Sequence, residues 1–405
     1  MRLLYCLAIL PGFIFVSCSS HNELKPGSWR GIIQIQGEQL PFNFEVAADS
    51  SSKKIIYLRN AGEKLLLDEI SMEDDSIKIG LHIFDATLKA KITNDHLTGF
   101  FIKNYEKAYR LPFEASFGES FRFVANNNSK QEDFTGKYAT TFIHGSDTTR
   151  AIAMFKQQRN HAEGTFLTPT GDYRYLEGNI INDTLHLSTF DGNHAYLFTA
   201  TKIGHNTLQG EYWSGKAWHE KWIAVKDDHA ELPDAESLTK LKTGYEKIDF
   251  SFRDVKGDTI HPTDAKYKNK VLILQLFGTW CPNCMDETKF LAPWYKQHKN
   301  NGIEIIGLAY ERKNDFNYAS ERVKKMKEKL GVDYDFVIAG TFDKRNASES
   351  LPMLDSVYAF PTTIFIGKDG KVKKIHTGFT GPGTGVYYDQ FIQDFNHTIN
   401  DLLAE

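Results

Sequence analysis

The alternation of apolar and polar positions divides the chain into two parts. Across residues 29–225, short runs of alternating apolar and polar side chains are separated by Gly, Asn and Asp, as at 184–188 and 195–201. A period of two residues is typical of half-buried β-strands, and helical periodicity is almost absent from this part. We therefore predict an all-β N-terminal region.

The β-rich region also contains a weak internal repeat. The echoed segments are 75–79 with 183–187, 97–101 with 208–212, and the starts 29–31 with 134–136. They predict two related β units, at 18–128 and 129–226, joined by the polar, Asn-rich segment 126–133. Coincidence is the alternative, because strand and turn patterns resemble one another.

The composition changes after residue 226. Residues 227–242 form a charged connector with Pro233 and few large apolar side chains, which predicts a domain boundary. From 243 to 405, strand patterns alternate with helix patterns, and this predicts an α/β domain whose central sheet is covered on both faces. We expect a hairpin at 248–260, strands at 271–277, 303–309, 336–339, 362–366 and 372–377, and helices at 282–298, 318–330 and 388–403. The predicted fold class is therefore multidomain.

The chemistry of the chain centres on Cys281-Pro282-Asn283-Cys284, which follows the apolar strand 271–277. A cysteine at the start of a helix is favoured as thiolate by unpaired N–H groups and the helix dipole. We predict that Cys281 attacks a disulfide and that Cys284, one turn further on, resolves the mixed intermediate. A structural disulfide or half of a zinc site is the alternative. Zinc needs two more ligands, and no second cysteine pair or closely spaced histidine pair follows, so we predict no metal.

The other two cysteines, Cys6 and Cys18, lie in the first eighteen residues. Residues 3–16 are apolar but too short to span a bilayer, and a small residue precedes Cys18. The segment 1–17 resembles a bacterial lipoprotein signal, which implies that Cys18 becomes the lipidated first residue. Phe15 departs from that pattern, so plain secretory cleavage is the alternative. Loss of Cys6 would leave the redox pair as the free thiols of an exported protein.

The region from about 245 to 405 resembles the thioredoxin superfamily, and within it the TlpA/ResA-type thiol-disulfide oxidoreductases of the bacterial cell envelope. The residues that carry the likeness are Asp249, Phe250, Gly257, segment 277–284, segment 360–363, Asp369, Gly370 and Gly378. The resemblance implies a cofactor-free reductase, anchored by lipid in a membrane and facing the periplasm or exterior. Its implied partners are client protein disulfides, including apocytochromes, and an envelope electron donor.

The same resemblance implies several site residues. Pro361 would be cis and lie against the cysteines, and the backbone of Phe360 would pair with an extended client segment. Trp280 would contact the client, with packing against the helix start as the alternative. Glu287 would tune the thiols or move a proton, with a solvated helix residue as the alternative. Gln275 stands where cytosolic thioredoxins carry a buried aspartate, which makes Glu287 the better proton acceptor.

Two other functions compete with the reductase. A thiol peroxidase of the peroxiredoxin type is disfavoured, because such enzymes carry Thr three residues before the attacking cysteine and this chain has Gly278. Alternatively, the β region is a binding module for an envelope partner or glycan, with a subordinate redox domain. The aromatic residues of 212–222 fit sugar stacking, but core packing explains them better. The net charge of -4 does not indicate nucleic-acid binding.

Overall fold

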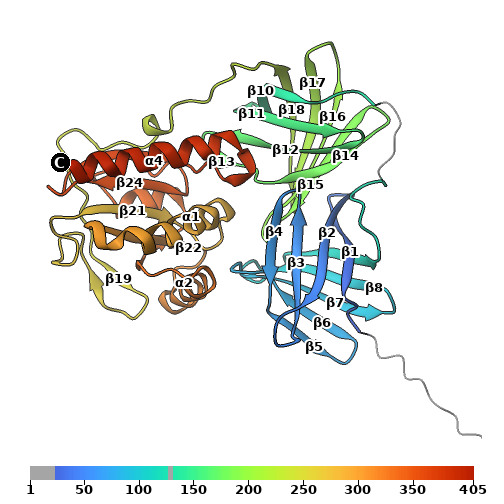
Figure 1. Cartoon of the computed structure of the whole chain (residues 1–405), viewed down its shortest axis with the longest axis horizontal. Helices are drawn as coiled ribbons and strands as arrows, with labels where there is room; N and C mark the ends of the chain where they lie inside the picture. The colour runs from blue at the N-terminus through green and yellow to red at the C-terminus, as the bar shows by residue number, and fades with distance from the viewer. Residues whose placement is uncertain (1–22, 126–130) are drawn as a thin grey trace, which may run out of the picture.

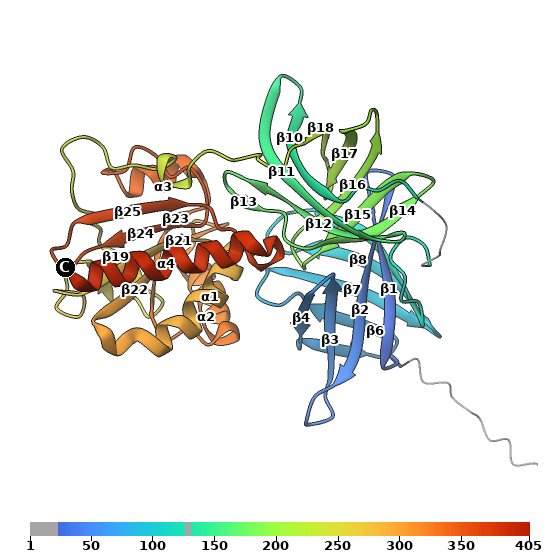
Figure 2. The ribbon, with the colours of Figure 1, turned by 45° about the horizontal axis from the view of Figure 1, so that its top comes forward.

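The computed structural model describes residues 23–125 and 131–405 and arranges them as two β units and one α/β domain. In Figures 1 and 2 the two β units lie together on one side, and the α/β domain lies on the other. The predicted signal 1–17, with Cys6, and the lipidation residue Cys18 lie outside the described residues. No helix among residues 23–125 and 131–405 is long and apolar enough to cross a membrane.

The first β unit is a nine-stranded antiparallel sheet with the order β4-β3-β2-β1-β9-β8-β7-β6-β5. Its strands are β1 (Gly27–Ile35), β2 (Glu38–Ala48), β3 (Lys54–Asn60), β4 (Glu63–Leu67), β5 (Ile70–Glu73), β6 (Ser76–Gly80), β7 (Ala86–Thr93), β8 (His96–Lys103) and β9 (Arg110–Phe117). Alternate residues of β1, among them Trp29, Ile33 and Ile35, are buried. The period of two seen in the sequence is thus the alternation between core and outer face.

The second β unit has the order β11-β10-β18-β17-β16-β15-β14-β12-β13, and an additional β11–β12 pairing closes it into a barrel. Its strands are β10 (Gly136–His144), β11 (Asp147–Gln158), β12 (His161–Thr168), β13 (Gly171–Asp172), β14 (Leu176–Ile181), β15 (Thr184–Phe190), β16 (Ala195–Lys202), β17 (Thr207–Ser214) and β18 (Trp218–Lys226). Tyr212 and Trp222 are buried in its aromatic core, as core packing predicts. Trp213 stacks on His219 and packs against the neighbouring hydrophobic cluster, and Trp218 is 48% exposed.

The echoed sequence segments occupy equivalent places in the two β units. The order β2-β1-β9-β8-β7-β6-β5 of the first unit is matched by β11-β10-β18-β17-β16-β15-β14 in the second. The repeated segments therefore fall on β6 and β15, on β8 and β17, and at the starts of β1 and β10. A shared strand order is what an internal duplication predicts. The units differ in closure, because β4 and β5 form the two edges of the first sheet.

The α/β domain contains a mixed seven-stranded sheet with the order β20-β19-β23-β22-β21-β24-β25. Its elements are β19 (Phe252–Asp254), β20 (Thr259–Ile260), β21 (Val271–Phe277), α1 (Pro282–His298), η2 (Lys299–Asn301), β22 (Ile303–Glu311), α2 (Phe316–Leu330), β23 (Asp335–Thr341), α3 (Lys344–Ser350), β24 (Thr362–Ile366), β25 (Val372–Thr377), η3 (Pro382–Thr384) and α4 (Val386–Ala404). Every residue of β21 and β22 is buried, so both faces of the sheet are covered. The prediction missed α3, since Ala347 is its one buried residue.

The segment predicted as a connector joins the second β unit to the α/β domain. It contains the short helix η1 (Ala235–Ser237), and Leu241 forms an isolated β-bridge with Leu354. In both views the start of α4 points toward the second β unit. The second β unit and the α/β domain therefore also meet outside the connector, as where the Gly381 N–H donates to Asp172.

Candidate active site

The loop between β21 and α1 is held by a buried carboxylate at the end of β22. The backbone N–H and hydroxyl of Thr279 donate to the two oxygens of Glu311, at 2.9 and 2.8 Å. Burial raises the pKa of Glu311 to about 7. The sequence analysis missed this residue. The available signal was a charged side chain two residues after the end of the apolar strand predicted at 303–309.

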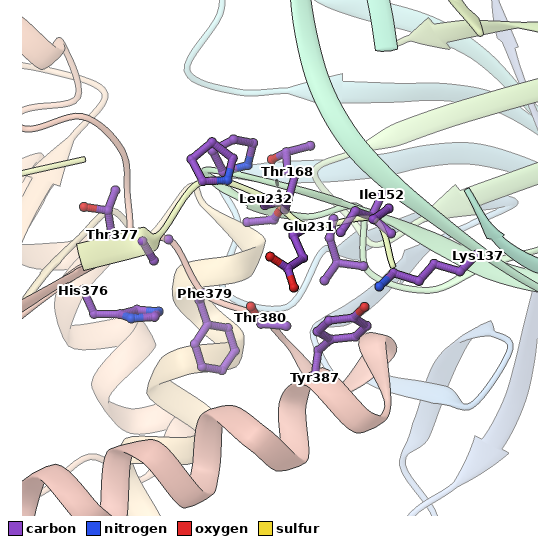
Figure 3. A pocket seen from close by; sticks show the side chains of 17 residues that line it. Lys137, Ile152, Thr168, Glu231, Leu232, His376, Thr377, Phe379, Thr380 and Tyr387 are labelled. Carbon is purple, nitrogen blue, oxygen red and sulfur yellow. Dashed lines mark hydrogen bonds between the residues drawn. The ribbon is translucent and has the colours of Figure 1, made fainter. Parts of the chain in front are cut away.

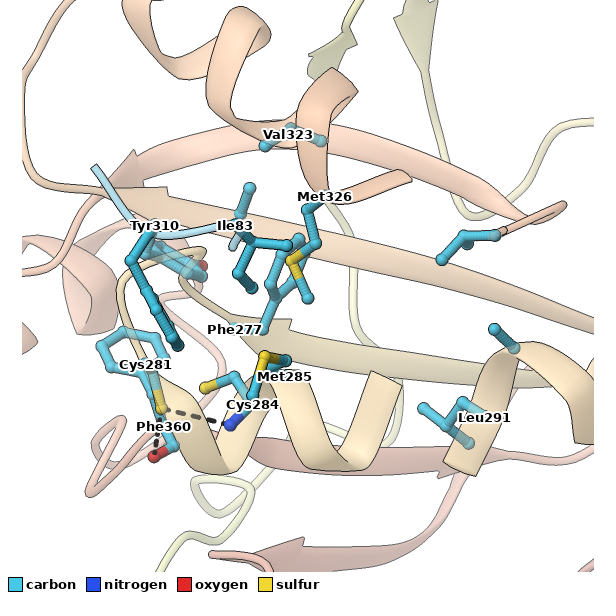
Figure 4. Packing of buried hydrophobic residues seen from close by; sticks show 14 of the residues in the cluster. Ile83, Phe277, Cys281, Cys284, Met285, Leu291, Tyr310, Val323, Met326 and Phe360 are labelled. Atoms are coloured by element: carbon cyan, nitrogen blue, oxygen red, sulfur yellow. Dashed lines mark hydrogen bonds between the residues drawn. The ribbon is translucent and has the colours of Figure 1, made fainter. Parts of the chain in front are cut away.

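Cys281 is the N-cap residue of α1, and Pro282 occupies the first helical position. The Cys284 backbone N–H donates to Cys281 Sγ at 3.3 Å (Figure 4). The sulfur thus accepts an N–H at the positive end of a 17-residue helix. Cys281 therefore lies at the N-terminus of α1, with its sulfur in contact with the helix backbone.

Cys284 differs from Cys281 in its surroundings. Its side chain is fully buried, whereas Cys281 remains 7% exposed, and both are free thiols. Burial raises the pKa of the Cys284 thiol, and the contact with Cys281 raises it further. Burial thus favours the protonated form of Cys284.

Pro361 follows Phe360, whose backbone carbonyl contacts the Cys281 thiol. The Phe360–Pro361 peptide bond is cis, as the family resemblance implied. The Cys281 thiol donates to the Phe360 carbonyl at 3.7 Å (Figure 4). The Gly378 N–H donates to the Pro361 carbonyl at 2.8 Å, which ties this turn to the end of β25. The structure therefore brings Phe360 and Pro361 to the cysteines from almost eighty residues away.

Glu287 is 1% exposed and lies in a polar network behind the cysteines. Its two oxygens accept hydrogen bonds from the Gln275 amide at 2.8 Å and the Thr363 hydroxyl at 2.6 Å. The Gln275 amide also donates to Thr288, whose hydroxyl donates to the Cys284 carbonyl. Burial raises the pKa of Glu287 to about 7. The alternative of a solvated helix residue is therefore wrong.

Replacing Glu287 by glutamine should flatten the pH dependence of the free energy of unfolding. Because its pKa rises from 4.5 to about 7, the folded state binds more protons than the unfolded state between these values. The stability from this site is complete below pH 4.5 and is lost as the pH rises through about 7. The loss reaches about 3 kcal/mol, at about 1.4 kcal/mol per pKa unit.

Urea unfolding at mildly acidic and mildly alkaline pH measures this difference. The unfolding free energy of the wild type should fall more steeply with pH than that of the Glu287→Gln variant. Glu321→Gln, on the exposed face of α2, is the matched control and should behave as the wild type. Equal slopes for the wild type and Glu287→Gln would contradict the prediction.

Trp280 both packs and borders the surface beside Cys281. Its indole N–H donates to the Tyr310 carbonyl at 2.8 Å, and its ring contacts Phe342 and Phe360. The Arg312 guanidinium lies 4.4 Å from the ring centroid. Packing and client contact, given as alternatives from the sequence, are therefore compatible at this position.

The second β unit packs directly on the active-site loop. The Asn193 side chain donates to the Trp280 carbonyl at 2.9 Å, and the Asn283 side chain donates to the Asp172 carbonyl at 3.1 Å. Gly171 leaves no room for a larger residue, because an added Cβ would lie 2.2 Å from Asn283 Nδ2. The residues on either side of Cys281 are thus held by the β region.

A buried ionic cluster around Arg174 joins all three parts of the chain. Its guanidinium donates to Asp286 at 2.7 and 3.0 Å, to Asp191 at 3.1 Å and to Glu63 at 2.5 Å. Glu63 belongs to the first β unit, Asp191 to the second and Asp286 to α1. The four side chains are at most 7% exposed. No sequence signal indicated this cluster, because Glu63 and Asp286 lie 111 and 112 residues from Arg174, on opposite sides of it in the chain.

The first β unit docks on α2. Ile83, in the turn after β6, is buried beside Val323, Met326 and Phe277 of the α/β domain (Figure 4). Around this apolar contact, basic residues of α2 meet acidic residues of the β unit. The pairs are Lys325 with Glu69 at 2.7 Å, Lys329 with Asp68, and Arg322 with Asp85 at 3.5 Å. The basic face of α2 is therefore an internal contact surface.

A separate cavity of about 490 Å³ lies between the second β unit, the connector and α4 (Figure 3). Ile152, Leu232, Phe379 and Tyr387 contribute to its walls, and neither cysteine does. Within the described ranges, no cluster of three or more His, Cys, Asp or Glu side chains is arranged to hold a metal.

Comparison with known proteins matches residues 243–375 to the model of the AhpC/TSA family. The thiol-disulfide oxidoreductase ResA of Geobacillus thermodenitrificans is 31% identical over 140 residues, which are 35% of this chain and 72% of the relative. The ResA of Bacillus subtilis is 28% identical over 138 residues, which are 34% and 69% of the two chains. A thioredoxin-family thiol:disulfide interchange protein of Chlorobium tepidum has 22% identity and a TM-score of 0.30, covering 39% of this chain and 95% of that one. The family model includes neither β unit.

Proposed function

The chain belongs to the ResA family of thiol-disulfide oxidoreductases, and from this premise we propose that it uses Cys281 and Cys284 to reduce disulfide bonds in exported client proteins. The observation that carries this proposal is the asymmetry of the pair. Cys281 accepts an N–H at the helix start and remains 7% exposed, whereas Cys284 is fully buried behind it. This asymmetry suits one attacking and one resolving thiol.

The proposed reaction proceeds in two exchanges. The Cys281 thiolate attacks one sulfur of the client disulfide, a Cys281–client disulfide forms, and the other client sulfur leaves as a thiolate. Cys284 then loses its proton and attacks Cys281 Sγ, so that the Cys281–Cys284 disulfide forms and the client leaves with two electrons. A dithiol donor in the envelope must supply two electrons to restore the pair.

In this scheme Glu287 accepts the proton of Cys284. A carboxyl group with a pKa of about 7 is partly ionised at neutral pH, so it can both take and return a proton. Gln275 and Thr363 hold the carboxylate by hydrogen bonds at 2.8 and 2.6 Å. Glu287 and the thiol of Cys284 lie on the same buried side of α1, away from the client surface.

An insulin reduction assay tests the proposal. The mature chain, kept reduced by a small dithiol, should accelerate precipitation of the insulin B chain above the rate of the dithiol alone. The redox potential of the pair should lie near the value of about -270 mV that thioredoxin shows. A potential near the value of about -120 mV of the oxidant DsbA, with no insulin reduction, would contradict the proposal. Hydrogen peroxide consumption with a thiol donor tests the peroxidase alternative.

The cellular setting is part of the same proposal. Residues 1–17 would direct export, Cys18 would carry the lipid anchor, and the protein would face the periplasm or exterior, with apocytochromes among the clients. Replacing Cys18 by serine should move the protein from the membrane fraction to the soluble fraction, because the anchor is lost. Mass spectrometry of the N-terminal peptide measures the modification directly. Finding the same membrane association in wild type and variant would contradict lipid anchoring at Cys18.

A further inference from the structure

We propose that the second β unit forms one wall of the client groove, and that this groove selects extended client segments with acidic side chains beside the cysteine. The inference rests on the proposed reductase function. It assigns a role in substrate selection to a region that the family match does not include.

The groove lies beside Trp280 and Phe360 and has a volume of about 910 Å³. Trp280, Phe342 and Phe360 give it an aromatic surface. Thr170, from the turn between β12 and β13, contributes to the lining from the second β unit. The groove is therefore built jointly by two parts of the chain.

The wall around Thr170 is held by hydrogen bonds within the turn and by a contact with Gly378. The Thr170 N–H and hydroxyl contact the Thr168 hydroxyl at 3.3 and 3.1 Å. The turn packs against Gly378, where an added Cβ would lie 3.1 Å from the carbonyl oxygen of Pro169. On its other side Thr168, Pro169 and Gly171 line the cavity of Figure 3. The turn thus separates the cavity from the groove.

This wall limits what can reach Cys281. The thiol is only 7% exposed, and the Trp280 carbonyl beside it is occupied by Asn193 of the second β unit. A broad folded surface cannot lie flat on the site while the β unit is docked. A single extended segment, paired with the backbone near Phe360, fits a groove of this kind.

The charges of the groove favour acidic segments. Lys344 and Arg345 line it and are exposed, and Arg312 stacks on Trp280 and Phe342 at its edge. None of these three cations forms an ion pair with a carboxylate in the described part of the chain. The one acidic lining residue, Asp343, accepts the N–H groups of residues 345 and 346 at 3.0 Å. An incoming carboxylate would therefore meet mainly positive charge.

Two matched peptides test the selection by charge. Each carries one cysteine as a mixed disulfide with 2-mercaptoethanol, flanked by Asp in one peptide and by Lys in the other. The pre-reduced protein should react with the acidic peptide about threefold to tenfold faster at low salt, and the preference should shrink at high salt. Lys344→Glu combined with Arg345→Glu should reverse the preference. Equal rates for the two peptides with the wild type would overturn the inference about charge.

A bulky side chain in the wall tests the role of the β unit. Thr170→Trp should lower the ratio of the acidic-peptide rate to the rate with hydroxyethyl disulfide, a small neutral substrate, by about tenfold or more. Thr148→Trp, on an exposed position of β11, is the matched control and should keep the wild-type ratio. Circular dichroism and the redox potential check that both variants fold. An unchanged ratio in Thr170→Trp would overturn the inference that the second β unit forms a wall of the client groove. A wild-type protein that reduces neither substrate would overturn the reductase function itself.

Discussion

Replacing Cys281 by serine should abolish disulfide reduction, whereas replacing Cys284 by serine should stop the reaction at the mixed disulfide. Cys281 is the thiol that accepts the Cys284 N–H, and it remains 7% exposed whereas Cys284 is fully buried. Without it no sulfur is available for the first attack, so the insulin reduction rate should fall by about a thousandfold or more, as when a nucleophile is removed from a catalytic unit. The Cys284 variant keeps that first attack, because its loss leaves the helix start and Cys281 in place.

The two variants control for one another, since each changes one sulfur to oxygen in the same helix. Mass spectrometry without reductant should find a covalent client adduct on the Cys284→Ser variant and none on the Cys281→Ser variant. An adduct through Cys284, or insulin reduction by Cys281→Ser near the wild-type rate, would contradict the assignment of attacking and resolving thiols.

The largest stability effect is expected at Arg174. Its replacement by methionine leaves the buried carboxylates of Glu63, Asp191 and Asp286 without the guanidinium. Lys289, 3.7 Å from Asp286, and His194, 3.1 Å from Asp191, remain. Breaking a buried ion pair from one side costs about 3–5 kcal/mol, because the remaining charge has lost both its solvent and its partner. The free energy of unfolding, measured with urea, should fall by about this amount. Because the three carboxylates come from the two β units and α1, the contacts between these parts should weaken together.

An exposed arginine provides the control. Arg59 lies 3.7 Å from Glu45, and both side chains are 45% exposed. Arg59→Met should change the free energy of unfolding by less than about 1 kcal/mol, as for a surface ion pair. Adding Asp286→Asn to Arg174→Met should recover part of the loss, since one unpaired charge is removed. A change at Arg174 no larger than at Arg59 would contradict the structural role of the cluster.

The fold was predictable where the pattern is local. The boundaries of β21, α1, β24 and β25 match the predicted ranges, because local signals mark their starts. β21 is a continuous apolar run, α1 begins after Cys281, Pro361 precedes β24, and the turn at Asp369 and Gly370 precedes β25. The short helix α3 was not predicted, because one buried residue produces no helical period. The closure of the second β unit was also not predicted. It depends on the pairing of β11 with β12, and the sequence of one strand does not indicate which strand pairs with it.

The candidate site likewise contains residues that the sequence predicted and residues that it did not. Cys281, Cys284 and Pro361 were identified from motifs, because a thiol at a helix start and a proline before a strand are features of short segments. The sequence left the burial of Glu287 open. The same helix sequence is compatible with a glutamate that faces solvent and with one that a sheet covers. Glu311 was missed, because its partner Thr279 is 32 residues away.

The sequence by itself determined the alternation of strands and helices, the repeat within the β region and the thiol pair. These depend on neighbouring residues, whose spacing sets the secondary structure and the backbone chemistry. Only the tertiary structure decided that Arg174 joins three parts of the chain, that Glu287 is buried, and that Thr170 borders the groove beside Trp280. These contacts join residues up to 112 positions apart, and they exist because the β units dock on the α/β domain.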